Sequence, residues 1–186
     1  MQNEVQRYGA AMQALHWLTA VLVLAAFALG PEEEHGHSAG PDLGTQWHET
    51  LGMTVLALSV LRVLVALFSR RPAVAYGPPL MALAARLVKL ALYGLLFAVP
   101  LSAIVGSWLD GHALTLLGGI EVAPPAAFGA SHSDWLLDVH EFLGDAILWV
   151  AGLHAAAGIF HHVVMRDAAL TAMLPAPLAR WLGQRP

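Results

Sequence analysis

Four histidines lie inside or at the ends of hydrophobic segments of this chain, and they are the residues best suited to do chemistry. An ionisable side chain within a membrane span is costly, so each of them requires a partner. Neutral imidazole is also the commonest side-chain ligand of metal ions. A metal centre bound between imidazoles from two segments satisfies both histidines at once. The four are His16, His48, His140 and His154.

The spacing of two of these histidines indicates what kind of centre they bind. His140 and His154 are fourteen residues apart in the last hydrophobic segment. In an α-helix this spacing is about four turns, or roughly 21 Å along the axis, and it brings both side chains to nearly the same face. That distance suits one haem near each side of a membrane, with each iron held by two histidines.

The hydrophobic segments that carry these residues are long enough to cross a bilayer. The chain of 186 residues is 58% hydrophobic and only 12% charged, whereas soluble domains carry about 25% charged residues. Four segments reach the length of a membrane span, roughly 17 to 25 residues. We therefore expect an all-α integral membrane four-helix bundle, a single domain over residues 1–186. The spans are expected at about 10–30, 47–68, 86–109 and 135–164, with a kink at Pro100 in the third.

The chain contains no cysteine. Disulfides, iron–sulfur clusters and covalent haem attachment through a Cys-x-x-Cys-His motif are therefore excluded. Any haem has to be held non-covalently, by ligation and packing.

The basic residues predict how the spans are oriented. All nine Lys and Arg residues fall on one side of the four-span arrangement, and basic residues mark the cytoplasmic side. Both termini are therefore expected in the cytoplasm. The outer loops, about 31–46 and 110–134, contain acidic residues but no Lys or Arg. They are rich in Gly and Pro, so we expect little regular structure there beyond a short interfacial segment over 114–120. The chain has no Lys-rich cluster suited to nucleic acid.

The depth of each histidine predicts the pairs. His48 opens the second span at the outer edge, level with His140, whereas His16 lies in the cytoplasmic half of the first span, nearer His154. The expected arrangement is an outer haem between His48 and His140 and an inner haem between His16 and His154.

Small residues follow the histidines at a helical spacing. Gly52 and Gly144 each come four residues after a histidine, within a repeated His-Glu-x-Leu-Gly pattern. Residues four apart share a helix face, so a glycine there leaves room for a flat macrocycle. The alternative is that these glycines serve close helix packing.

Arg62 is the one basic residue deep in a span. It lies fourteen residues after His48, which places it on the same face and at the level of the inner haem. No Asp or Glu lies at its depth, so a haem propionate is its expected partner. The alternative is that its side chain extends toward the cytoplasmic surface.

At these residues the chain resembles the bacterial cytochrome b561 family of small four-helix di-haem cytochromes. The resemblance covers essentially the whole chain and is strongest at its ends. It is carried by Arg7-Tyr8, Leu15-His16-Trp17 and His48, and by Gly152-Leu153-His154-Ala155-Ala156-Ala157, His161-His162, Arg166-Asp167 and Met173-Leu174-Pro175.

The resemblance implies two b-type haems ligated by the four histidines, a place in the bacterial inner membrane and electron exchange with the quinone pool. The chain is most similar to the superoxide oxidase-like group, which implies an oxidoreductase that takes electrons from superoxide outside and reduces ubiquinone. The outer loops are acidic, however, and acidic loops repel an anion. They favour a basic periplasmic electron-transfer protein, or a neutral quinol, as the outer partner.

Quinone chemistry also needs protons, and several residues near the membrane edges are candidates. Trp17, Trp135 and Tyr93 are candidates for stacking on a quinone, although such residues usually anchor helix ends at the interface. Each proton candidate has a structural alternative as a capping or hydrogen-bonding residue. The proton candidates are His161, His162, Glu141, Glu49 and Asp145.

Two other classes of function stay open. The chain is alternatively a non-catalytic membrane electron-transfer subunit for a partner enzyme. It is otherwise a haem-free helical scaffold or metal-handling protein that uses the cluster from Glu32 to His37, although a solvated acidic loop is the simpler interpretation of that cluster.

Overall fold

The computed structural model describes residues 7–30, 43–69, 78–126 and 134–183 and contains four long helices. They are α1 (Ala10–Ala28), α2 (Leu43–Phe68), α3 (Pro79–Leu109) and α4 (Asp134–Phe160). Each is long and apolar enough to cross a membrane, α4 together with its continuation to Met165. The predicted all-α membrane bundle is therefore confirmed, and the cluster from Glu32 to His37 lies outside the described residues.

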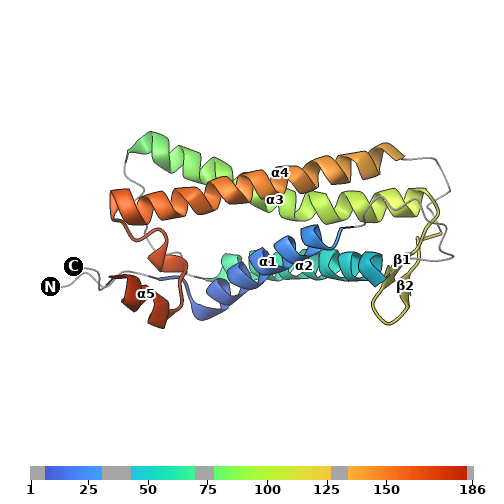
Figure 1. Ribbon diagram of the computed structural model, residues 1–186, viewed down its shortest axis with the longest axis horizontal. Coiled ribbons are helices and arrows are strands. Elements are labelled where there is room, and N and C mark those ends of the chain that lie inside the picture. The colour runs from blue at the N-terminus through green and yellow to red at the C-terminus, as the bar shows by residue number, and fades with distance from the viewer. Residues whose placement is uncertain (1–6, 31–42, 70–77, 127–133, 184–186) are drawn as a thin grey trace.

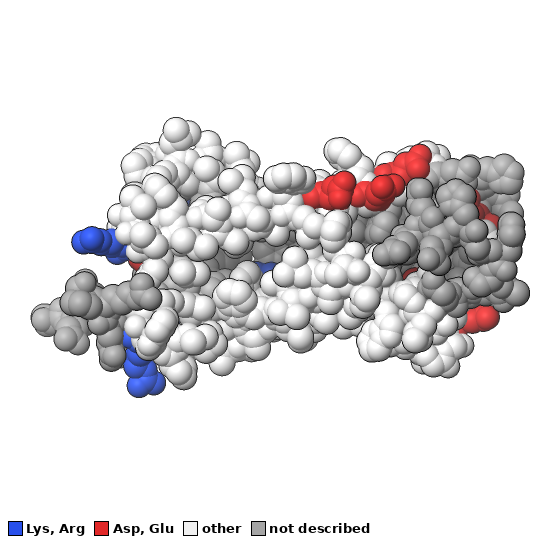
Figure 2. Space-filling model, in the orientation of Figure 1, with Lys and Arg blue, Asp and Glu red and all other residues white. Residues whose placement is uncertain are grey.

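The helices form two antiparallel pairs that lie side by side. Helix α1 packs along α2, α3 packs along α4, and the two pairs meet through a smaller contact between α2 and α3 (Figure 1). Helix α1 begins at the same end of the bundle where the short helix α5 (Ala176–Gly183) lies. On the face shown in Figure 2, Lys and Arg gather at that end and most Asp and Glu at the other. This segregation agrees with the expected orientation, which itself stays a prediction.

The best-packed layer lies at mid-length between the two pairs. Val55, Leu96 and Ile147 are at most 6% exposed and pack together. Ile147 is seven residues from His140 and seven from His154, so this apolar layer lies midway between the expected positions of the two haems.

The third helix is longer than predicted. It begins at Pro79 instead of residue 86, and it runs without interruption through Pro100 to Leu109. The predicted span began at Arg86, but a charged side chain at the membrane edge extends to water and does not stop a helix. Proline at the first helical position loses no hydrogen bond there, and its fixed φ suits a helix start.

The second outer loop contains a β-hairpin, which includes the short segment expected over 114–120 and extends beyond it to Val122. Strands β1 (Leu114–Leu116) and β2 (Ile120–Val122) pair antiparallel, with Leu114 opposite Val122. The turn uses Gly118 at φ 82° and Gly119 at φ 75°. Glycine adopts positive φ without steric cost, and this adjacent pair was the signal for a hairpin.

The chain after α4 folds back onto α1. A π-helical turn (His161–Met165) ends at Arg166 with φ 53°, and a 3₁₀ turn (Thr171–Met173) leads into α5. Gln13 Nε2 donates to the Ala172 carbonyl oxygen at 3.2 Å, and Trp17 Nε1 donates to that of Met173 at 2.9 Å. The C-terminal segment is thereby fastened to the first half of α1.

Candidate functional site

The outer pair of histidines is brought together as the depths predict. The rings of His48 on α2 and His140 on α4 have centres 5.9 Å apart, with planes at 89°. Both side chains are half-buried. Two helices that belong to different pairs of the bundle therefore present imidazoles to each other.

The inner pair has nearly the same geometry. The rings of His16 on α1 and His154 on α4 have centres 6.2 Å apart, with planes at 80°. Two imidazoles on opposite sides of one metal ion have ring centres roughly 6.3 Å apart, because a metal–nitrogen bond is about 2 Å long and a ring centre lies about 1.1 Å from its nitrogen. Both separations match that value, so the donor set fits one iron per pair.

Backbone carbonyls orient the two outer rings. His48 Nδ1 donates to the Ala26 carbonyl oxygen at 2.7 Å, and His140 Nδ1 donates to that of Val99 at 2.8 Å. A carbonyl oxygen only accepts, so the proton is on Nδ1 and the lone pair is on Nε2. This is how proteins usually hold a metal-ligating histidine, with the second nitrogen fixed by a hydrogen bond.

The glycines of the repeated motif face open space. A Cβ added at Gly52 or Gly144 would meet no atom within 4 Å, whereas one at Gly106 would meet Leu137 at 3.2 Å and Leu136 at 3.3 Å. Gly106 is thus the glycine that permits close helix packing. The arrangement at Gly52 and Gly144 favours room for a flat ligand over the packing alternative.

Arg62 lies against the inner pair. Its Nη2 is 3.1 Å from His16 Nδ1, and its Cζ is 5.3 Å from the centre of the Tyr93 ring. It contacts His16 and Tyr93 within the bundle, which disfavours the alternative of extension toward the cytoplasm. Its Nε is buried and has no hydrogen-bond partner, which leaves one donor of this cation for a further acceptor.

The Arg62 contact has a chemical consequence for His16. Guanidinium only donates, so Nδ1 of His16 accepts and the proton of a neutral ring is on Nε2. Binding of a metal through Nε2 of His16 therefore requires Arg62 to turn away from this ring. The outer pair has no such requirement.

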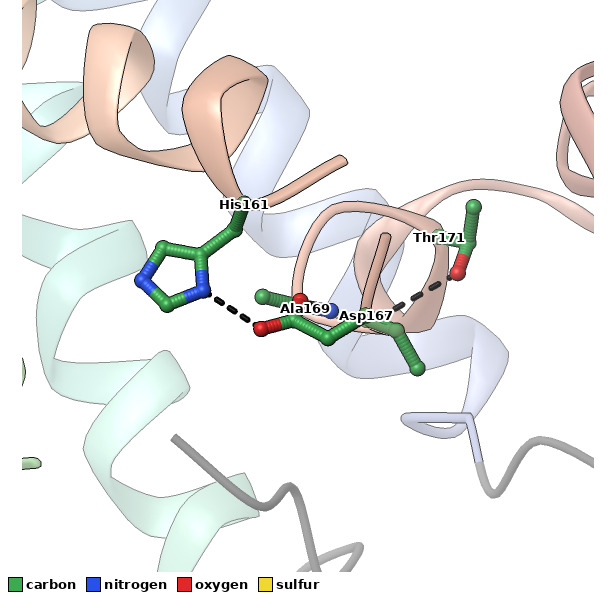
Figure 3. Close-up of polar contacts among 5 residues, drawn as sticks. His161, Asp167, Ala169 and Thr171 are labelled. Atoms are coloured by element: carbon green, nitrogen blue, oxygen red, sulfur yellow. Dashed lines mark hydrogen bonds and ion pairs between the residues drawn. The ribbon is translucent and has the colours of Figure 1, made fainter. Parts of the chain in front are cut away.

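Four of the five proton candidates fall into two groups. His161 Nδ1 contacts Asp167 Oδ2 at 2.5 Å (Figure 3), and Asp167 Oδ1 accepts from the Ala169 N–H at 2.9 Å. The His161 side chain is 12% exposed, and His162 beside it is half-buried. Glu141 and Asp145 are exposed on α4, so the structure does not bring them to either pair.

The cavity at the inner end of the bundle was not predicted from the sequence. A cavity of about 420 Å³ lies between the start of α1 and the C-terminal segment. Gln13 and Trp17 line one side of it, and Leu174, Pro175 and Leu178 line the other. The residues Met173-Leu174-Pro175 stood out in the sequence through the family resemblance. Nothing in them indicated that the C-terminal segment folds back onto α1.

Four membrane-length helices with two facing pairs of histidines define a helical membrane protein of the kind that binds metal-centred cofactors between its spans. The model of the family described as prokaryotic cytochrome b561 matches residues 7–176. The chain belongs to this family, whose members are integral membrane proteins of bacteria that bind b-type haem.

Curated relatives agree with this assignment over most of their length. The chain is 31% identical to "Cytochrome b561 homolog 2" of Escherichia coli (strain K12), covering 92% of this chain and 93% of the relative. It is 28% identical to "Probable superoxide oxidase CybB" of Yersinia pestis, covering 91% and 97%. It is 25% identical to "Cytochrome b561 homolog 1" of Escherichia coli (strain K12), covering 92% and 98%.

Proposed function

We propose that this protein is a di-haem b-type cytochrome of the bacterial inner membrane that transfers electrons between an outer donor and the ubiquinone pool. The observation that carries the proposal is the pair of facing imidazole couples, with ring centres 5.9 Å and 6.2 Å apart. Their separation along α4, roughly 21 Å, supports one couple near each membrane surface.

The four histidines hold the two cofactors. His48 and His140 ligate the outer haem, and His16 and His154 ligate the inner one. Bound haem supplies a reversible one-electron carrier. Because each site has a histidine on both sides, the two imidazoles would hold the haem between them and would leave no room for dioxygen or substrate at the metal. Electrons therefore enter and leave by outer-sphere transfer.

Residues between and beside the couples control their surroundings. The layer of Val55, Leu96 and Ile147 excludes water at mid-depth, which keeps the dielectric low between the two sites. Arg62 lies at the inner couple, where its unpartnered Nε suits an anionic propionate. Its positive charge favours the reduced state of an iron nearby, and so directs electrons inward.

Two features of the inner end support quinone reduction there. The cavity of about 420 Å³ beside Trp17 is mainly apolar and large enough for a quinone ring. His161 is held through Nδ1 by Asp167, and its imidazole is a candidate to exchange a proton with the quinone. His162 and Glu141 remain further candidates, with Glu141 the weaker because it is exposed.

Two outer donors are supported by different observations. The relative from Yersinia pestis is named a probable superoxide oxidase, which supports superoxide as the donor. The acidic end of the bundle (Figure 2) supports a basic periplasmic protein instead, as expected of a non-catalytic electron-transfer subunit.

A stopped-flow experiment separates these donors. The purified oxidised protein is mixed with a pulse of superoxide, with and without ubiquinone, while the haem absorption bands are followed. Fast reduction that passes on to ubiquinone supports the superoxide reaction. No reduction by superoxide, together with ready reduction by ubiquinol, supports a carrier with a protein partner. A folded preparation without haem absorption refutes the proposal altogether.

A further inference from the structure

The β-hairpin packs against α2 beside His48, one of the outer pair of histidines. Leu114 at the start of β1 is only 4% exposed. It closes a small cavity of about 30 Å³ whose other walls include His48, Gly52 and Ile104. The first residue of β1 is therefore buried against the part of α2 that carries His48.

Two side chains of α2 fasten this strand. Glu49 Oε2 accepts a hydrogen bond from the Thr115 backbone N–H at 2.5 Å, and Thr50 Oγ1 accepts one from that of Leu117 at 2.9 Å. The Thr50 hydroxyl donates its own proton to the Gln46 carbonyl oxygen at 2.7 Å. Its lone pairs are thereby available to Leu117.

The fastened groups belong to the free edge of the hairpin. Thr115 and Leu117 alternate along the chain with Leu114 and Leu116, so their N–H groups point away from β2. A strand edge with unpaired N–H groups is a liability, and an isolated two-stranded hairpin is marginally stable in water. Glu49 and Thr50 supply the acceptors that this edge lacks.

We propose that Glu49 and Thr50 are positioning residues that hold β1 as a cover over the outer redox site. They follow His48 without a gap, so one turn of α2 supplies the ligand and the two fasteners of its cover. The cover keeps water-soluble oxidants and reductants from the outer haem edge and restricts electron entry to donors that fit the hairpin surface. The inference rests on the proposed haem between His48 and His140.

The test compares a variant that removes the acceptor groups of Glu49 and Thr50 with a variant that replaces these residues conservatively. The double variant Glu49→Ala/Thr50→Val removes both acceptors, whereas Glu49→Gln/Thr50→Ser keeps an acceptor oxygen at each position. Thr54→Val is a matched control, because the exposed Thr54 hydroxyl bonds only the Thr50 carbonyl oxygen of its own helix, at 2.7 Å. Each protein is reduced and mixed with hexaammineruthenium(III), which takes one electron and becomes ruthenium(II).

Reoxidation of the outer signal should be faster in the alanine/valine variant by about tenfold or more, since two hydrogen bonds no longer oppose opening of the hairpin. The conservative variant and Thr54→Val should react like the parent protein. In a His140→Ala background, which lacks the outer haem, the acceleration should disappear. Unchanged reoxidation in a variant that retains both haems overturns the cover.

A second variant addresses the case in which the double variant does not fold. Trp108 Nε1 donates to the Val122 carbonyl oxygen of β2 at 3.1 Å, so Trp108→Phe loosens the same hairpin without altering α2. It should speed the outer reoxidation alone, by a smaller factor. Lack of haem in the parent protein refutes the proposed function, whereas intact haem with unaltered rates in Trp108→Phe refutes only the cover.

Discussion

Replacement of His140 by alanine tests the pairing of the histidines most directly. His140 contributes to one couple only, and its ring centre is 5.9 Å from that of His48. The other couple lies fourteen residues away along α4, beyond the packed layer around Ile147. Sites separated by more than about 10 Å without shared partners usually respond independently. We therefore expect the haem content to fall from two per chain to one.

The structure also sets the size of the indirect effect on the inner haem. A unit charge about 21 Å away, at an effective dielectric constant of about 20, contributes roughly 0.8 kcal/mol. For a one-electron couple this corresponds to about 35 mV. Loss of the outer haem should thus shift the midpoint potential of the inner haem by no more than about that amount.

The assay combines haem quantification with a spectroelectrochemical titration. His112→Ala is the matched control, because His112 is an exposed histidine of the outer end that belongs to neither couple. It should retain both haems at their parental potentials. If His140→Ala lost both haems while its helicity by circular dichroism stayed intact, the pairing by depth would be refuted. A shift of the inner potential far above 35 mV would refute the independence of the two sites.

Three further changes probe the inner end. Arg62→Leu removes a positive charge next to His16, so a redox titration should show a lower inner midpoint potential and an unchanged outer one; equal potentials in both proteins would contradict this role. Asp167→Asn weakens the contact that holds His161, so ubiquinone reduction by the reduced protein should slow while both potentials stay constant. Leu174→Trp fills the cavity beside Trp17, so the KM for ubiquinone should rise by about tenfold or more, with haem content unaffected. An unaltered KM would exclude this cavity as the quinone site.

The spans and the histidine couples were predictable because their signals are long-range. Membrane-length apolar segments and one-sided basic residues predict where the spans lie and in which direction each one runs. Once direction is known, the depth of each histidine follows from its position along the span. The pairing of His48 with His140, and of His16 with His154, could therefore be predicted without knowing how the helices pack.

The local fastenings were not predictable because backbone groups carry no sequence signature. Nothing at Ala26 or Val99 indicates that its carbonyl oxygen accepts from a histidine. The contact between Arg62 and His16 was also missed, since a span long enough for snorkelling permits several positions of an arginine side chain. The hairpin, by contrast, had a readable signal in Gly118-Gly119 that a general expectation of irregular loops obscured.

Helix α2 combines the separate parts of the site at a regular interval. His48, Val55 and Arg62 follow one another at seven-residue steps, which is about two helical turns each, so all three lie on nearly the same face. That face supplies the outer ligand, the mid-depth apolar layer and the cation of the inner couple. Glu49, one residue from His48, lies about 100° around the helix and is directed to β1 instead. Under the proposed function, a single helix thereby contributes residues to both redox sites, to the apolar layer between them and to the cover over one of them, and the arginine at its inner end favours electron transfer inward.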